Sequence, residues 1–202
     1  MHLTKYTHSC VRLEREGLGV LVVDPGAWSE PEALRGADAV LITHEHADHI
    51  DPAHLRGLDI PVYAPHGAAL PGLPDLRVTG VGAGDAFTAA GFCVTAHGGA
   101  HARIYGDAPD CANLGYLIEG TVYHPGDSFH LPDAPVHTLL VPLHAPWMRI
   151  SEAIDFTRTA HPERAVGIHD AQLNSRGLAS ANGWLEEQGG TDYRYLEPGA
   201  EL

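Results

Sequence analysis

The feature that most constrains this chain is the segment LITHEHADHID, residues 41–51, in which histidines and acids directly follow an apolar run. His44 and His46 are two residues apart, so on an extended or turn backbone their side chains lie on one side and can bind a single ion. On a helix the same side chains would diverge by about 200°. Asp48 and His49 follow at once and point differently, which suits a second ion beside the first. The segment therefore predicts a metal site at the end of a buried strand.

The spacing is H-x-H-x-D-H and not H-E-x-x-H, because the residue four positions after His44 is Asp48. A helical zinc-protease site is therefore excluded. The alternative is an exposed polar loop with solvated histidines. Three histidines and a carboxylate gathered directly after a buried strand argue against it. Asp51 is expected to cap a short helix that begins at Pro52.

Composition narrows the function further. The 202 residues include 15 histidines, more than the 12 lysines and arginines together, and histidine is the commonest metal ligand in proteins. The formal net charge of −14 disfavours non-specific binding of nucleic acid. We expect no membrane span and no secretory signal. The three cysteines form no C-x-x-C pair, so we expect no disulfide and a cytoplasmic protein.

The pattern of apolar runs and turn residues predicts strands and short helices in one domain, residues 1–202. Strands are expected in 2–14, 19–26, 38–43, 60–65, 76–81, 85–91, 92–99, 112–120, 121–127, 137–143, 164–170 and 191–199. Helices are expected in 29–36, capped by Ser29, in 51–57, in 151–162, capped by Ser151, and in 175–190. Residues 66–75 are expected to form a loop or a short helical turn. Helices and strands at both ends with strands between them favour two sheets with outer helices.

A site for two ions needs further ligands, and the later chain offers them at strand ends. Asp127 follows a strand and a Pro-Gly turn, and its two carboxylate oxygens can bridge two cations. His169 ends the apolar run AVGIH. His101 and His97 compete for one further position in the segment VTAHGGAHARI. His97 follows its strand more directly, so local geometry alone favours it.

These residues resemble the metallo-β-lactamase fold, a superfamily of mostly metal-dependent hydrolases. THEHADHID matches its H-x-H-x-D-H signature, HPGDS resembles its Gly-Asp element, and GIHD resembles its last histidine. The early THSCVRLE followed by LVVDPG resembles the start of compact, stand-alone bacterial members. The resemblance implies an α/β (α+β) fold, a four-layer αββα sandwich with the site along one edge.

The same resemblance implies the ligand assignment. His44, His46 and a mid-chain histidine would bind one metal, Asp48, His49 and His169 the other, and Asp127 would bridge them. The stretch GGAHA resembles the glycine-rich stretch of bacterial relatives, which favours His101 over His97. The histidine that is not a ligand would support the ligands or face a substrate.

Other side chains have weaker claims. His144 ends a buried strand and could line the pocket or donate to an oxyanion, or it could be a core histidine. His8 could support the ligands from the first strand pair. Trp147 could form a pocket wall, although core packing is the simpler interpretation. No G-x-S-x-G element surrounds a serine, which argues against a serine nucleophile.

We therefore predict a metal-dependent hydrolase with a binuclear site. Two divalent ions, Zn²⁺ or alternatively Fe or Mn, would hold a bridging hydroxide, and Asp48 would orient it or accept its proton. The predicted substrate is a small-molecule ester, lactone or phosphodiester. The alternative is a metal-binding sensor or interaction module without hydrolytic turnover. The sequence leaves the oligomeric state open, a homo-oligomer included.

Overall fold

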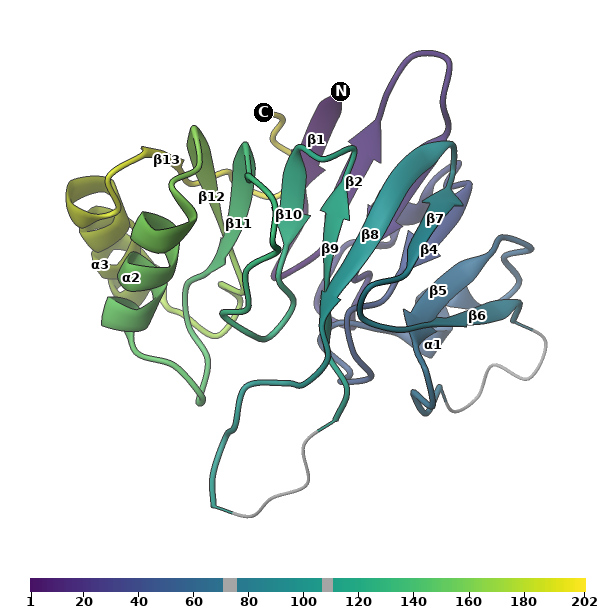
Figure 1. The fold of residues 1–202 in the computed structure, drawn as a ribbon, viewed down its shortest axis with the longest axis horizontal. Helices are drawn as coiled ribbons and strands as arrows, with labels where there is room; N and C mark the ends of the chain where they lie inside the picture. Colours follow the sequence, from purple (N-terminus) through teal and green to yellow (C-terminus); the bar gives the residue numbers. More distant parts are fainter. Residues whose placement is uncertain (71–75, 107–110) are drawn as a thin grey trace.

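The structure, a computed structural model, describes residues 1–70, 76–106 and 111–202. Its strands form two sheets, one of six strands and one of seven, that lie face to face (Figure 1). Residues 71–75 of the predicted 66–75 loop lie outside the described residues. The expectation of two sheets is confirmed.

The first sheet has the strand order β1-β2-β3-β4-β5-β6. β1, β2 and β3 pair antiparallel, whereas β3, β4, β5 and β6 pair parallel. Because parallel strands end at the same edge, the segments that follow β3 and β4 emerge side by side. The strand bounds are β1 His2–Lys5, β2 Val11–Glu14, β3 Val20–Val23, β4 Ala39–Leu41, β5 Val62–Pro65 and β6 Val78–Val81.

The second sheet has the order β13-β12-β11-β10-β9-β8-β7. β7, β8, β9 and β10 form an antiparallel meander, and β10 to β13 pair parallel. The ends of β10 and β12 therefore lie at one edge of this sheet. The bounds are β7 Ala86–Ala89, β8 Phe92–Gly98, β9 Leu114–Ile118, β10 Val122–His124, β11 Thr138–Pro142, β12 Arg164–Ile168 and β13 Asp192–Arg194.

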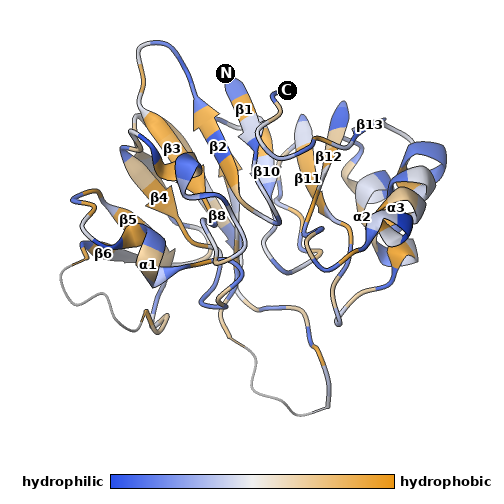
Figure 2. Ribbon diagram, turned by 180° about the vertical axis from the view of Figure 1, so that it is seen from behind, coloured by the Kyte–Doolittle hydropathy of each residue, from blue (hydrophilic) through white to orange (hydrophobic). Residues whose placement is uncertain are grey.

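Three apolar clusters show that the fold has four layers. The largest joins the inner faces of the two sheets, with Leu41 of the first and Ile168 of the second among its members. A second cluster packs the helices α2 (Ile150–Ala160) and α3 (Ser175–Gln188) on the outer face of the second sheet. A third packs the 3₁₀ turn η1 (Pro31–Leu34) and the short helix α1 (Pro52–Leu55) on the first sheet. This layer order is the αββα sandwich. Figure 2 shows apolar residues along strands such as β3 and β4.

Two of the three predicted helix caps are wrong. Asp51 caps α1 as expected, since its side chain accepts a hydrogen bond from the Ala53 N–H. Ser29 instead donates to the Gly26 carbonyl, and η1 begins after Glu30. The predicted Ser151 cap lies inside α2, which begins after Arg149, and the side chain of Glu152 accepts from the Arg149 N–H. In both cases the chain enters the helix one or two residues away from the serine.

The segment 199–202 lies against β1, the edge strand of the first sheet. The Lys5 N–H donates to the Ala200 carbonyl at 3.0 Å, and the Leu202 N–H donates to the Leu3 carbonyl at 2.9 Å. Backbone groups of Leu3 and Lys5 on the outer side of β1 are therefore paired with this segment. Among the described residues, no helix has the length and apolar content to span a membrane.

Candidate metal centre

Five segments meet where the two sheets open at one edge. The turn after β4 carries His44 to His49, the turn after β10 carries Asp127, and His169 directly follows β12. The connection between β8 and β9 supplies His101, and the turn between β1 and β2 supplies His8. Chain segments that are distant in sequence therefore place their polar side chains at one point.

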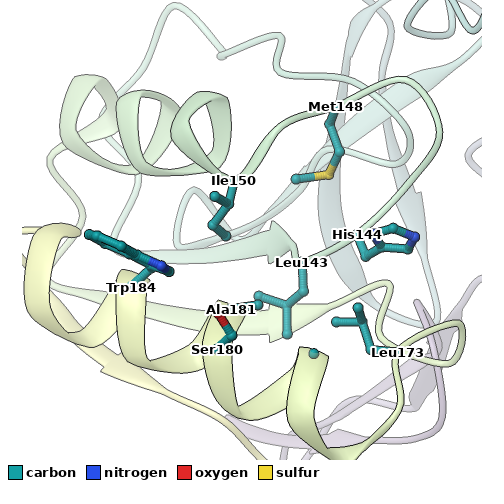
Figure 3. Close-up of a pocket in the computed structure, with 9 residues that line it drawn as sticks. Leu143, His144, Met148, Ile150, Leu173, Ser180, Ala181 and Trp184 are labelled. Carbon is teal, nitrogen blue, oxygen red and sulfur yellow. The ribbon is translucent and has the colours of Figure 1, made fainter.

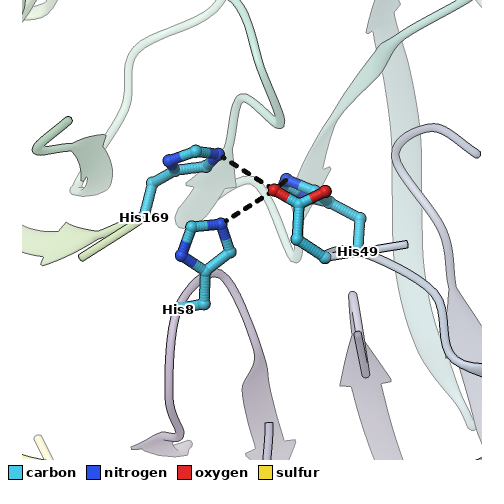
Figure 4. Close-up of side chains that lie close together, drawn as sticks. His8, His49 and His169 are labelled. Atoms are coloured by element: carbon cyan, nitrogen blue, oxygen red, sulfur yellow. Dashed lines mark hydrogen bonds and ion pairs between the residues drawn. The ribbon is translucent and has the colours of Figure 1, made fainter. Parts of the chain in front are cut away.

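Three groups of these side chains are close enough to hold an ion. Within each group, one nitrogen or oxygen atom per residue lies within 4.8 Å of the corresponding atoms of the others. The groups are His44, His46 and His101; His44, His49 and Asp127; and His8, Asp48, His49 and His169. The rings of His8, His49 and His169 are turned toward one another (Figure 4).

Asp127 lies at the centre of the arrangement. Its Oδ1 is 3.1 Å from His49 Nε2, and its Oδ2 is 3.1 Å from His169 Nε2. The same Oδ2 is 3.3 Å from His101 Nε2. Because Asp127 is 3% exposed, it is held among these rings with almost no access to water.

Among the residues that the structure describes, four buried atoms at this centre have no hydrogen-bond partner: Asp127 Oδ1 and the Nε2 atoms of His49, His101 and His169. Each of the three nitrogens lies within 3.3 Å of an Asp127 oxygen, yet none is aligned as a hydrogen bond. Leaving a buried polar atom unsatisfied costs about 1–3 kcal/mol. Nitrogen and carboxylate lone pairs that converge on one space suit a divalent cation such as Zn²⁺. The residues present therefore fit the expected metal.

The opposite ring nitrogens are anchored by acceptors. His49 Nδ1 lies 2.7 Å from Asp24 Oδ2, and His169 Nδ1 lies 2.5 Å from the His144 carbonyl. His101 Nδ1 lies 2.5 Å from the Ala102 carbonyl. With the proton on Nδ1 donated to an acceptor, Nε2 keeps its lone pair for the centre. This is the arrangement that orients metal-binding imidazoles.

His46 faces the centre with Nδ1, whereas His49, His101 and His169 face it with Nε2. Its Nδ1 lies 3.1 Å from His44 Nε2, and its Nε2 lies 3.7 Å from the Cys111 sulfur. His44 is anchored by the Thr43 hydroxyl, which lies 3.0 Å from its Nδ1. Cys111 stands far from the H-x-H-x-D-H segment in the sequence, so no local pattern indicates this contact.

The electrostatics favour positive charge at the centre. Burial raises the pKa of Asp127, but the His49, His101 and His169 rings outweigh it and hold that pKa well below its usual range. Burial lowers the pKa of His49, but the carboxylates of Asp127 and Asp24 outweigh it and hold that pKa well above its usual value. Both shifts show that the centre favours positive charge, which suits a bound cation.

Asp48 is the more open carboxylate of the two, with 21% of its side chain exposed. Burial raises its pKa, but the hydrogen bond from His8 and the nearby His49 ring outweigh this and lower it to about 2. Asp48 is therefore ionised at neutral pH and can accept a hydrogen bond from a water molecule at the mouth of the site.

Two glycines allow the loops to approach closely. A Cβ atom on Gly26 would lie 1.8 Å from the Asp48 carbonyl oxygen. Gly126 has a φ of 61°, and a Cβ there would lie 2.3 Å from Asn113 Oδ1. Asn113 accepts a hydrogen bond from the Asp127 N–H and donates one to the Pro125 carbonyl. The Pro-Gly-Asp turn is thereby fixed with its carboxylate pointing to the centre.

The structure brings all seven predicted ligand residues together and separates the ambiguous histidines. His101 lies in the centre, whereas His97 contacts the Thr95 hydroxyl at 3.0 Å and belongs to none of the three groups. His8 lies closer than expected, 3.1 Å from Asp48 Oδ2. Trp147 is more than packing, since its Nε1–H donates to Asp127 Oδ2 at 2.9 Å. The assignment of each ligand to one of two ions stays a prediction.

Three supporting side chains escaped the sequence analysis: Asp24, Asn113 and Asp170. Asp24 anchors His49 and also accepts hydrogen bonds from the N–H and hydroxyl of Thr43. A signal was present, because Asp24 ends an apolar strand before Pro-Gly, much as Asp127 follows one. Asp170 adjoins His169 and faces β1, which no local pattern indicates.

His144 lies beside the centre and not in it. Its carbonyl anchors His169, while its side chain is exposed and lines a cavity of about 220 Å³ (Figure 3). Apolar side chains from the loop after β11, the start of α2, the segment before α3 and α3 itself form most of the cavity lining, among them Leu143, Met148, Ile150, Leu173 and Trp184. None of the seven predicted ligands lines it. His144 therefore lines a cavity beside the metal centre, and a role of its side chain toward a substrate stays a prediction.

The two-sheet sandwich and its edge of histidines and carboxylates define a metal-binding protein of the metallo-β-lactamase fold. The model of the family described as beta-lactamase superfamily domain matches residues 2–169. The chain therefore belongs to the metallo-β-lactamase superfamily.

Relatives extend the match over nearly the whole chain. Protein Rv0786c of Mycobacterium tuberculosis is 39% identical over 208 residues, which cover 97% of this chain and 96% of that protein. A protein of Exiguobacterium sp. named UPF0173 metal-dependent hydrolase is 27% identical over 194 residues, 84% of this chain and 85% of its own.

Solved structures share the fold. Igni18, a metallo hydrolase from the archaeon Ignicoccus hospitalis, superposes with a TM-score of 0.74 at 22% identity, over 100% of this chain and 97% of its own. CmlA, a diiron β-hydroxylase from Streptomyces venezuelae, gives a TM-score of 0.79 at 16% identity. The match covers 100% of this chain and 53% of CmlA.

Proposed function

We propose that this protein is a metal-dependent hydrolase with a binuclear centre that acts on a small-molecule ester, lactone or phosphodiester. One observation carries the proposal: buried, unpartnered nitrogen and oxygen atoms from distant segments converge on a single space. The relative named metal-dependent hydrolase supports the reaction type. The acidic charge of the chain argues against a nucleic-acid substrate and supports a small molecule instead.

In this proposal His44, His46 and His101 would hold one ion, and Asp48, His49 and His169 would hold the other. Asp127 would serve both, since its two oxygens face different rings. When bound, the pair of ions would lower the pKa of water from about 15.7 towards 7 and stabilise the negative charge that develops on the substrate. Histidine and carboxylate ligands suit Zn²⁺. Iron is the alternative, because CmlA, which shares the fold, is a diiron protein.

Side chains of this protein orient the attacking water and receive its proton. Asp48 is ionised and partly exposed, so it can hold the attacking water by a hydrogen bond and receive its proton. Trp147 donates to Asp127 and fixes the rotation of that carboxylate. Asp24 fixes the ring of His49 in the same way. Because these groups are held before substrate arrives, little reorganisation is needed during the reaction.

Metal analysis followed by a substrate panel tests the proposal. We expect elemental analysis of the purified protein to find about two metal ions per chain, as a binuclear centre requires. We expect turnover of at least one ester, lactone or phosphodiester, and its loss when a chelator is present. His46→Ala and Asp48→Ala should abolish turnover and leave a folded protein. Metal binding at full occupancy without turnover on any panel member would favour the sensor interpretation instead.

A further inference from the structure

We propose that His8 is a positioning residue for Asp48 and not a metal ligand, although it lies among the ligands. In this arrangement His8 Nε2–H donates to Asp48 Oδ2 across 3.1 Å and fixes the carboxylate that receives the proton. The inference rests on the proposed function, because it assigns Asp48 its supporting partner. The position of the proton on the His8 ring does not depend on the substrate.

The protonation of the His8 ring follows from its other nitrogen. The Ala171 N–H points at His8 Nδ1 across 3.3 Å, so Nδ1 must be the acceptor. A backbone N–H cannot accept, and a neutral imidazole carries one proton. That proton is therefore on Nε2, which faces Asp48. The His8 ring is a donor toward the centre.

Three of the predicted ligand histidines have the opposite arrangement. His49, His101 and His169 each place Nδ1 against an oxygen acceptor and leave Nε2 without a hydrogen-bond partner. A metal on His8 Nε2 would force the ring proton onto Nδ1, where it would meet the Ala171 N–H. Two donors would then face each other across 3.3 Å. His8 therefore differs from these histidines in which ring nitrogen carries the proton, although it lies at a similar distance from the centre.

Asp48 depends on His8 because its other neighbours are farther away. Among the described residues, Asp48 Oδ2 lies 3.8 Å from His49 Nε2 and 3.7 Å from His169 Nε2. Neither is a hydrogen bond, since both exceed the usual range of about 2.7–3.2 Å. Loss of the His8 donor would remove the hydrogen bond that fixes the rotation of the Asp48 carboxylate.

The backbone of His8 is locked so that its ring cannot drift. Its φ is 66°, a left-handed conformation in which Asn, Asp and His are enriched among residues other than glycine. Its N–H donates to Asp170 Oδ1 at 3.0 Å, and its carbonyl accepts from the His169 N–H at 3.0 Å. Asp170 is held in turn by Lys5 and Tyr195 through its Oδ2.

The ring of His8 is also packed on both sides. Its centroid lies 3.9 Å from that of His169 and 4.8 Å from that of Trp28, whose ring meets it edge-on. The side chain is 1% exposed, so it does not exchange hydrogen bonds with bulk water. A residue that is built so rigidly and that offers one proton to one carboxylate has the properties of a positioning group.

The first test reads the ring directly. Two-bond ¹H–¹⁵N correlation spectra of the zinc-loaded protein distinguish a nitrogen that carries a proton from one that carries a metal. We expect His8 to show a protonated Nε2 and a bare Nδ1, and His49, His101 and His169 to show protonated Nδ1 and metal-bound Nε2. A protonated Nδ1 on His8 in the loaded protein would overturn the inference, whether or not any substrate is ever found.

The second test uses variants. His8→Asn suits the left-handed backbone but cannot reach Asp48, whereas the amide of His8→Gln can reach it and donate. We expect His8→Asn to keep about two zinc ions per chain and to lower kcat about 10- to 100-fold, the usual range for a lost supporting group. KM should change less than threefold, and His8→Gln should recover part of kcat.

A matched control is His137→Asn, because His137 is a half-exposed histidine that pairs with Glu163 before β11. It should match the wild type in both zinc content and kcat. Loss of one zinc ion in His8→Asn, or an unchanged kcat in that variant, would overturn the inference. If no panel substrate is turned over, the proposed function fails, and the spectra and zinc content still decide the inference. If His8→Asn does not fold, the wild-type spectra decide it.

Discussion

Asp24 Oδ2 lies 2.7 Å from His49 Nδ1, and both side chains are completely buried. The same carboxylate accepts hydrogen bonds from the N–H and hydroxyl of Thr43, so its position is fixed before any ligand binds. The pair connects the end of β3 to the H-x-H-x-D-H turn. Through it, the first sheet sets the direction of a histidine that faces Asp127.

Asp24→Ala should lower zinc affinity about 10- to 100-fold, because His49 would lose the acceptor that fixes its ring. Competition against a chromophoric chelator measures this change. Asp133→Ala is the control, since that carboxylate is exposed. Equal affinities in the two variants would show that the Asp24 contact does not support metal binding.

His101→Ala and His97→Ala should separate the two histidines that the sequence left open. His101 lies within 3.3 Å of Asp127, whereas His97 contacts Thr95. We expect His101→Ala to lose most of one metal ion per chain and His97→Ala to keep the wild-type content. Elemental analysis after dialysis against metal-free buffer gives the answer. The reverse pattern would assign the ligand role to His97 and not to His101.

Trp147→Phe should keep the aromatic packing and remove one hydrogen bond. The Trp147 ring packs edge-on against Phe129 at 5.1 Å between centroids, and its Nε1–H donates to Asp127. A bond to a charged group contributes about 1.5–3 kcal/mol, so we expect at least a tenfold loss in turnover or metal affinity. The readouts are kcat on the panel substrate and a zinc titration. Wild-type values for both would assign Trp147 to packing alone.

Metal removal should destabilise the fold. An ion that binds only the folded state adds about 2.7 kcal/mol when its free concentration is about 100-fold above Kd. We therefore expect chelator to lower Tm by several degrees and added zinc to restore it. Asp127→Ala should show almost no response to either treatment. A zinc-dependent Tm in Asp127→Ala equal to that of the wild type would argue against Asp127 as the central ligand.

Lys5→Met should cost about 3–5 kcal/mol in the free energy of unfolding, because it leaves a buried carboxylate without its cation. Lys5 Nζ lies 2.8 Å from Asp170 Oδ2, with side-chain exposures of 0% and 6%. Urea unfolding of Lys5→Met, Asp170→Asn and the double variant measures the coupling of the pair. Costs that simply add would show that the two charges act independently.

Local patterns predicted the strands and the His44–His49 turn well, because buried strands and metal motifs are written in neighbouring residues. They did not identify Asp24, Asn113 or Asp170, since those side chains act on partners more than ten residues away. His8 stands near the other end of the chain from Asp170, and only the β1–β2 turn and β12 bring them together. Ser151 looked like a helix cap, but the chain enters α2 at Arg149, where Glu152 binds the first free N–H. The order of strands in the sheets brings these distant segments together, and local sequence patterns do not determine that order.

The pairing of segment 199–202 with β1 has a practical consequence for work with this protein. Shortening the chain to about residue 197, or displacing residues 199–202 with a rigid fusion, would remove the segment that pairs with β1. The donors and acceptors of that edge strand would then form an exposed row. Such a row is a template for strands of other molecules, so the shortened protein should form oligomers and precipitate. Affinity handles for purification belong on a flexible spacer.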